Sequence, residues 1–282
     1  MTQVRGAFLK LRRAKEHLDL INREAVEFIE DHLQYEATLI DDELGHQWDE
    51  LIWANITLPH ERFGIWLGDF VHNVRAALDY CVYAAVEEAN GKPGKHTQFP
   101  IYWSPDKWDE DVVHRVKPGL SPLHGLPQTS HQFALIDRIQ PYHVPQQDRP
   151  RHLLLKLQRM SNIDKHRKLH AANGVTGPPE ISYSPPGYVE VGKIEMVPGF
   201  ERLDPGAKIG RVERIIVSRP PPGTEVKVRL RGTATLEFGA ADQGTVAFLF
   251  DLPPILDAVY ALVSGFAVAP HVLIPTKPPR AS

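Results

Sequence analysis

The chain has 282 residues, enough for one large domain or two ordinary ones, and either option buries a core without metal or disulfide. Its 32 Lys and Arg residues against 35 Asp and Glu residues give a formal net charge of -3, so charge does not support a nucleic-acid partner. The single cysteine, Cys81, excludes an internal disulfide and fits a reducing compartment.

Both ends of the chain are expected to lack membrane or export signals. The first residues, MTQVRGAFLKLRR, are basic but lead into a charged helical pattern, so we expect no secretory signal. The most apolar stretch, Val246 to Pro270, is interrupted by Asp251, Asp257 and a Pro pair, and a membrane span needs an uninterrupted apolar run. We therefore expect a soluble, cytoplasmic protein without a membrane partner.

A long first helix is predicted from a coiled-coil-like seam. Its apolar residues alternate spacings of three and four: Val4, Ala7, Leu11, Ala14, Leu18, Ile21, Ala25 and Phe28. Such a seam would also permit pairing between two chains, which makes a homodimer through this helix one expected assembly.

A β-hairpin and a second long helix are predicted next. Gln34 to Ile40 and Leu51 to Leu58 flank a polar stretch, and the second segment alternates two sets of residues, Ile52, Ala54, Ile56 and Leu58 with Trp53, Asn55 and Thr57. The helix should run from about Glu61 to Asn90 and end at the Asn90-Gly91 pair, which suits a left-handed C-cap.

The middle third is rich in proline, glycine and histidine. Eight of the 14 histidines lie between His96 and His170. A long connection is expected from Gly91 to Pro150, with short helices near Pro105 to Val116 and Ser130 to Ile139. Another helix should begin after Pro150 and close at Asn173-Gly174.

The last third predicts strands followed by a helix. β-branched runs separated by Pro and Gly clusters fill Ile181 to Phe250, which indicates an antiparallel sheet. A final helix is expected over Pro253 to Phe266, then a loose Pro-rich tail. The fold class is therefore α+β. The expected organisation is a helical bundle with the hairpin over 1–174, a β-rich segment plus C-terminal helix over 175–270, and a flexible tail over 271–282, in one composite domain.

Charged residues occupy positions in two helices where apolar ones are expected. On the second helix, His72, Arg75 and Asp79 lie as a stripe along the border of the apolar face. On the helix after Pro150, Asp164 and Arg167 continue a seam formed by Leu153, Leu157, Met160 and Ala171. Because a buried unpaired charge costs several kcal/mol, roughly the penalty of a desolvated ion, we expect these two stripes to meet.

Two interpretations of this cluster remain open. It can be a structural salt-bridge network that fixes how the helices pair. It can also be a functional site, since His, Asp and Arg held in a partly desolvated pocket have the perturbed pKa values used in acid-base chemistry or phosphate binding. In that case the His-rich connection from His96 to His152 is the expected lid.

Common motifs of enzyme chemistry are absent from the sequence. There is no G-x-G-x-x-G, Walker loop, G-x-S-x-G elbow or H-E-x-x-H, and no cofactor is expected. His166 and His170 have helical spacing for one metal ion, but no third ligand stands at a recognisable offset, so we predict no metal. Cys81 lies in an apolar face and is expected to pack in the core.

Four segments resemble a family of uncharacterised bacterial proteins that share the motifs HN-x-[RK]-x-A-L-D and N-x-D-K-H-R. These segments are GDFVHNVRAALDYCVY (68–83), TQFPI (97–101), IQPY (139–142) and SNIDKHRKL (161–169). The resemblance covers about 67–169 and implies no settled activity. It marks nine positions: Asp69, His72, Asn73, Arg75, Asp79, Asn162, Asp164, His166 and Arg167.

A looser resemblance is to HEPN domains, helical bundles that include RNases and carry an Arg-x4-6-His motif. Arg159 and His166 match this motif, as do Arg12 and His17. Met160 follows Arg159 where the family favours a polar residue. The resemblance implies that Arg159 stabilises a phosphate and that His166 transfers the proton at a 2′-hydroxyl.

The sequence thus yields two functional hypotheses. The first is a binding or structural role centred on His72, Arg75, Asp79, Asp164 and Arg167, with a small ligand or a protein as the unidentified partner. The second is an enzyme that cleaves RNA or another phosphodiester without a metal ion.

Overall fold

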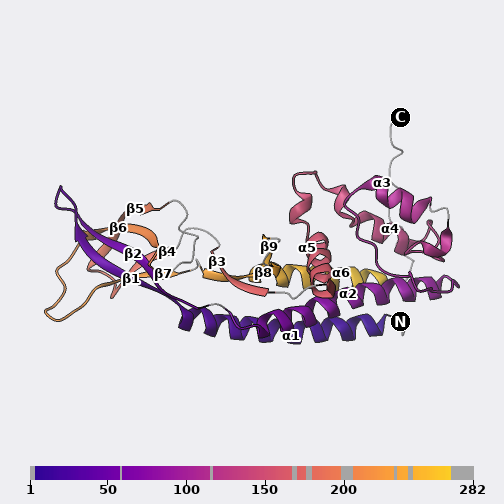
Figure 1. Ribbon diagram of the computed structural model, residues 1–282, viewed down its shortest axis with the longest axis horizontal. Coiled ribbons are helices and arrows are strands. Elements are labelled where there is room, and N and C mark those ends of the chain that lie inside the picture. Colours follow the sequence, from indigo (N-terminus) through magenta and orange to yellow (C-terminus); the bar gives the residue numbers. More distant parts are fainter. Residues whose placement is uncertain are drawn as a thin grey trace. The chain divides into compact units, whose positions relative to one another are not determined.

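The α+β class is confirmed by a computed structural model of the chain (Figure 1). The structure describes residues 4–57, 59–114, 117–166, 170–175, 180–197, 206–231, 234–240 and 244–267. These residues form two compact units. A helical unit takes its described residues from 4–18, 66–166 and 250–267, and a sheet unit takes them from 19–65 and 170–249. Helices α1 and α2 each contribute to both units.

The predicted first helix is α1, Arg5–His32. Every member of its apolar seam is buried, with at most 8% of its surface exposed at Val4 and none at Ala7, Ala14, Ile21 or Ala25. These exposed fractions are for a single copy of the protein, so other parts of the same chain cover the seam.

Helix α2, Arg62–Glu88, ends as its sequence predicts. Asn90 has a φ of 59°, in the left-handed region, and the Gly91 N–H donates to the Val86 carbonyl oxygen at 2.8 Å. This is the bond pattern of a Schellman C-cap. A Cβ at Gly91 would lie 2.7 Å from the Gly125 oxygen, so the close approach of that loop also requires glycine.

The remaining helices of the helical unit are short or medium in length. They are α3 (Pro105–Trp108), followed by a π-helical turn (Asp109–Val113), α4 (His131–Arg138), α5 (Leu153–His166) and α6 (Leu252–Ala267). Four 3-10 turns connect them, at Pro118–Leu120, Pro141–His143, Arg149–Arg151 and Leu249–Asp251. The two short helices predicted in the connection and the final helix are thus confirmed.

Within the described residues, Leu249–Ala267 is the one helical segment long and apolar enough to cross a membrane by length and composition. Part of it is buried in the helical unit through seven side chains of α6: Leu252, Ile255, Leu256, Val259, Leu262, Val263 and Phe266. The expectation of a cytoplasmic protein stays a prediction.

The prediction that the helix after Pro150 closes at Asn173-Gly174 is wrong. Helix α5 ends at His166, and Asn173 and Gly174 lie in strand β3, His170–Val175. Strand β3 pairs with β8, Ala234–Ala240, about sixty residues further along the chain. That distant partner supplies the backbone hydrogen bonds, which a local pattern cannot reveal. Ala171 therefore does not belong to the seam of α5.

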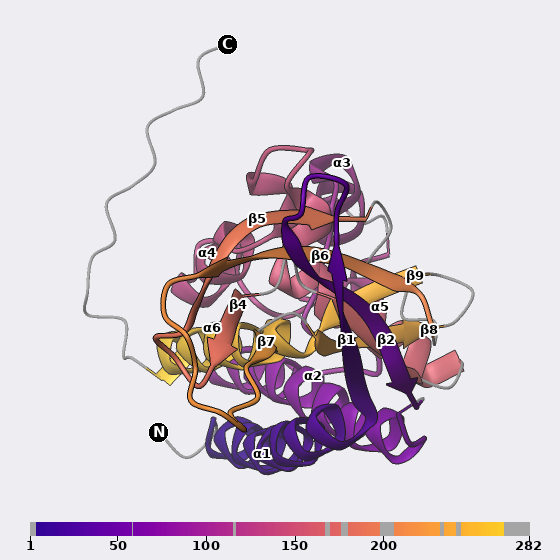
Figure 2. The same cartoon turned by 90° about the vertical axis from the view of Figure 1, so that its left-hand side faces the viewer.

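The predicted hairpin is formed by β1 (Leu33–Asp41) and β2 (Gln47–Ile56) and belongs to a larger sheet. The antiparallel order is β1-β2-β6-β5, with β6 at Lys208–Ile216 and β5 at Val189–Met196 (Figure 2). Instead of one sheet over 181–250, three form. The others are a ribbon of β4 (Glu180–Ser184) and β7 (Lys227–Arg231), and the order β3-β8-β9, with β9 at Gly244–Phe248.

The sheet unit has a hydrophobic core of its own, which lies between the four-stranded sheet and the β4-β7 ribbon. Leu51 and Trp53 of β2 are buried, so the odd-numbered positions of this strand face inward, and Asp49 is on the same side. The other buried residues of this core are Tyr183, Val189, Ile209, Val212 and Val228.

Candidate functional site

Arg75 and Asp79, one turn apart on α2, clamp the backbone of Phe99. The Phe99 N–H donates to Asp79 Oδ1 at 2.8 Å, and Arg75 Nη2 donates to the Phe99 carbonyl oxygen. The same guanidinium nitrogen lies 3.4 Å from Asp79 Oδ1. Two side chains of opposite charge thus satisfy both polar groups of a residue whose ring is fully buried.

Burial dominates the electrostatics of this clamp. Desolvation lowers the pKa of Arg75, opposed by the charge of Asp79. Desolvation likewise raises the pKa of Asp79, opposed by Arg75, the Phe99 N–H, Lys165 and His72. Among the residues that the structure describes, none is a hydrogen-bond partner of the buried Arg75 Nη1. The partner of each charge is therefore on its own helix, whereas the sequence suggested partners on α5.

Asp164 of α5 meets α2 about two to three turns before Arg75 and Asp79, at Gly68. A Cβ built on Gly68 would lie 2.5 Å from Asp164 Oδ1, so only glycine leaves room for the carboxylate. The pKa of Asp164 is raised chiefly by burial and also by the charge of Asp69, while His72 and Lys165 lower it. The sequence placed Asp164 against α2 and near His72 but in the wrong register, opposite Arg75 and Asp79.

Helix α1 adds His17 to this group. The His17 side chain is 10% exposed, and its Nδ1 lies 4.0 Å from Asp69 Oδ2. Asn73, one turn after Asp69, donates from Nδ2 to the Asp69 carbonyl oxygen at 2.7 Å. We name the five residues contributed by three helices the polar junction: His17, Gly68, Asp69, His72 and Asp164.

Sequence analysis overlooked His17 as a member of this site. The spacing of His17 could have indicated this role, because His17 lies three residues after Ala14 and four residues before Ile21. It therefore borders the buried seam of α1. A histidine at such a position needs a polar partner, as the charged residues of α2 and α5 do.

Two side chains of the polar junction are available to bind a ligand. Asp164 and His72 are exposed, and within the described residues neither makes a hydrogen bond or a close ion pair. Asp69 and Asp164 are close enough for each charge to act on the other. Two carboxylates and two imidazoles therefore gather here, and among the described side chains of the polar junction one pair, His17 and Asp69, is at ion-pair distance.

The remaining candidates of the sequence lie at the end of α5. Arg167 is outside the described residues, and so is the side chain of His166, although its backbone closes α5. Arg159 is exposed two turns before His166. The juxtaposition of Arg159 and His166 stays a prediction. Over the described ranges, no three His, Cys, Asp or Glu side chains are placed to hold a metal ion.

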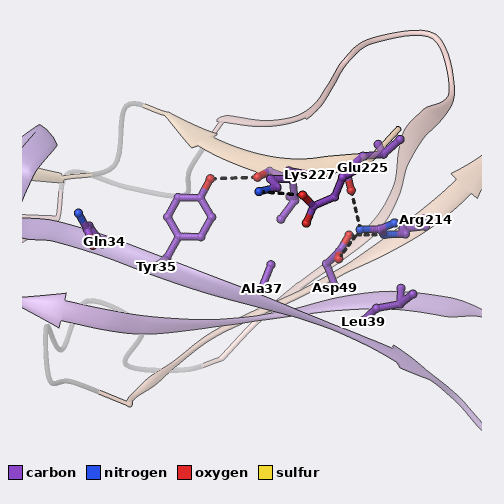
Figure 3. A pocket seen from close by; sticks show the side chains of 10 residues that line it. Gln34, Tyr35, Ala37, Leu39, Asp49, Arg214, Glu225 and Lys227 are labelled. Carbon is purple, nitrogen blue, oxygen red and sulfur yellow. Dashed lines mark hydrogen bonds and ion pairs between the residues drawn. The ribbon is translucent and has the colours of Figure 1, made fainter. Parts of the chain in front are cut away.

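The sheet unit contains a pocket of about 760 Å³ (Figure 3). Its floor is Asp49, which is 1% exposed and receives two bonds from Arg214, Nε to Oδ2 at 2.7 Å and Nη2 to Oδ1 at 2.8 Å. Tyr183 donates its hydroxyl to Asp49 Oδ2 at 2.8 Å. Burial and this bond to a carboxylate raise the pKa of Tyr183, and Asp49 raises that of Arg214.

The same pocket lies between two edge strands, β1 and β7. Side chains already make hydrogen bonds to backbone groups along β7. The Tyr35 hydroxyl donates to the Val228 oxygen at 3.0 Å and accepts from the Leu230 N–H at 3.1 Å. Arg214 Nη2 donates to the Val226 oxygen at 3.1 Å. Figure 3 shows these side chains reaching across from the four-stranded sheet. The polar groups that line this pocket are hydrogen-bonded to one another. They therefore stabilise the fold and leave few donors or acceptors for a ligand.

Fold and site together define an α+β protein in which three helices gather a group of imidazoles and carboxylates on the helical unit. The sequence matches no known protein family, and no curated protein or solved structure is significantly similar to it. The function must therefore be argued from the site itself.

Proposed function

We propose that this is a binding protein whose polar junction receives a small organic cation, an ammonium or guanidinium group. The observation that supports it is Asp164, whose carboxylate is held over Gly68 beside Asp69 with a raised pKa. Burial is the main cause of this raised pKa, and a cation bound between the two carboxylates would offset both the burial and the added repulsion from Asp69. Charge-assisted hydrogen bonds to carboxylates are also roughly twice as strong as neutral ones.

The clamp (Arg75 and Asp79) and the polar junction have different roles in this proposal. Arg75 and Asp79 hold the segment around Phe99 and are occupied by it, so they serve the fold. Asp69, His72 and Asp164 are left for the ligand. Lys165 influences both Asp79 and Asp164, and this links the clamp and the polar junction electrostatically.

Titration with putrescine by isothermal calorimetry at low ionic strength tests the proposal. The expected result is binding that weakens about 10- to 100-fold in Asp164→Asn, because a hydrogen bond to a charged group contributes roughly 1.5–3 kcal/mol. Asp106→Asn is the matched control, since Asp106 is an exposed aspartate on α3. Absence of binding, or equal affinity in the two variants, contradicts the proposal.

Metal-independent RNA cleavage is the rival function. Total RNA incubated with the protein and a chelator should stay intact if the protein only binds. Cleavage that Arg159→Ala abolishes and Asp164→Asn leaves unchanged would replace the binding proposal with the nuclease one.

A further inference from the structure

A second pocket, of about 500 Å³, lies in the helical unit where α4, the start of α5 and α6 meet. Its apolar wall is aliphatic throughout: Leu135, Ile139, Leu153, Leu154, Ala258, Ala261 and Leu262. Pockets of this volume enclose small organic ligands. It is at the opposite end of α5 from Asp164 and shares no residue with the polar junction.

The polar part of this pocket carries only positive or neutral groups. Arg138, Arg151 and His152 line it, and no acidic side chain does. Within the described part of the chain, the side chains of Arg138 and Arg151 make no hydrogen bond and no ion pair. Neighbouring Arg149 differs, because it donates to the backbone oxygens of Trp103, Tyr142 and Val144 and is occupied by the fold. Two of these arginines are therefore available to a ligand.

His152 and the first turn of α5 add further donors. The Leu154 N–H donates to His152 Nδ1 at 3.3 Å, so Nδ1 is the acceptor nitrogen and Nε2 carries the proton. Burial lowers the pKa of His152, which favours this neutral form. The N-terminus of a 14-residue helix also carries partial positive charge towards the same space.

We propose that this pocket binds a carboxylate with an aliphatic body, of the medium-chain fatty acid type. The aliphatic wall would cover the chain, and Arg138 and Arg151 would bind the carboxylate, since a guanidinium matches a carboxylate with two parallel hydrogen bonds. The small side chains of Ala258 and Ala261 on α6 leave the space that the chain fills. This site is independent of the proposed cation site.

Binding of octanoate below its micelle concentration, measured by calorimetry on the full chain, tests this assignment. We expect octanoate to bind, octanol to bind at least about tenfold more weakly, and acetate not to bind, because each control lacks one half of the recognised chemistry. Equal binding of octanoate and octanol overturns the role of the arginines. Binding to anionic lipid vesicles without binding of free octanoate assigns the surface to lipid and also overturns the proposal.

Substitutions test the arginines and the aliphatic wall of the pocket separately. Arg138→Gln and Arg151→Gln should each weaken octanoate about tenfold and leave octanol unchanged. The control is Arg5→Gln, an exposed arginine of α1 outside the pocket, which should bind as the wild type does. Ala261→Leu fills the pocket from an exposed position and should abolish both ligands without lowering the melting temperature. An Ala261→Leu variant that folds and still binds octanoate, or an effect of Arg5→Gln equal to that of Arg138→Gln, rejects the site.

Discussion

Asp79 illustrates how one side chain serves several partners. It accepts the Phe99 N–H, faces the Arg75 guanidinium and has a pKa raised by burial. Its side chain is still 38% exposed, so solvent screens part of this charge. The clamp is thus a local device that fastens the His-rich connection to α2, and its members are engaged in the folded protein.

Replacing Asp79 should therefore destabilise the protein. Asp79→Ala strands the Phe99 N–H and the Arg75 charge, and leaving such groups unsatisfied costs about 1–3 kcal/mol. Urea unfolding should show this loss, whereas Asp79→Asn, which keeps an acceptor for Phe99, should lose less. A stability of Asp79→Ala equal to that of the wild type would show that the clamp contributes nothing.

Asp164 gives a pH dependence of opposite sign to that of a paired carboxylate. Because its pKa is raised above the ordinary 3.8, its contribution to stability is fully present below that value and is lost as the pH rises through the folded-state pKa. Asp164→Asn should consequently raise the melting temperature at pH 7 by about 1–3 °C, a small effect because the group is exposed. Near pH 3.5 the two proteins should melt together, and a lower melting temperature of the variant at pH 7 contradicts this.

At the scale of elements, the contact between α2 and α5 depends on Gly68. Alanine normally stabilises a helix by about 0.5–1 kcal/mol over glycine, as we expect for Gly6→Ala in α1, where a Cβ would meet Tyr80 at an ordinary 3.5 Å. At Gly68 the new Cβ would meet the Asp164 carboxylate, so Gly68→Ala should destabilise instead.

A double-mutant cycle checks this contact. In the Asp164→Ala background the obstructing carboxylate is gone, and Gly68→Ala should become neutral or stabilising. Thermal unfolding of the four proteins gives the coupling between the two positions. Additive effects would mean that the helices do not approach each other at Gly68.

Local sequence patterns predicted the elements whose determinants are local. The seam of α1 and the cap at Asn90-Gly91 follow from spacing and from backbone preference, and both are confirmed. Strand β3 did not follow, because its pairing partner β8 is remote in sequence. The helical periodicity predicted which face of α5 carries Asp164, but not which position of α2 it contacts. That position depends on where a glycine allows the two helices to approach each other closely.

Asp49 was overlooked because the predicted strand began at Leu51 and left Asp49 in the polar stretch of the hairpin, whereas β2 begins at Gln47. The alternation also did not show which face is buried, and Ile52 and Ala54 are less buried than Leu51 and Trp53. Once the odd-numbered face is inside, a buried aspartate requires a partner such as Arg214, which lies on the neighbouring strand β6.

For the whole molecule, two cores imply two units that respond separately to substitution. Asp49→Asn removes a charge from the sheet unit and leaves the half-buried Arg214 without its charged partner; breaking a fully buried pair costs about 3–5 kcal/mol, and the partial exposure of Arg214 places this loss below that range. Scanning calorimetry should resolve two transitions, of which Asp49→Asn lowers one and Asp79→Ala lowers the other. A single transition lowered by both variants would show that the units unfold as one.

The discontinuity of both units also bears on synthesis by the ribosome. The helical unit needs α6, which ends at Ala267, and the core of the sheet unit needs β7, which ends at Arg231, although α1 contributes to both units from the start. Neither core can close until most of the nascent chain has emerged. Because His17 of α1 lies beside Asp69 of α2, the apolar stripe of α1 is exposed at least until α2 has been synthesised, which makes it a segment that a chaperone would have to shield.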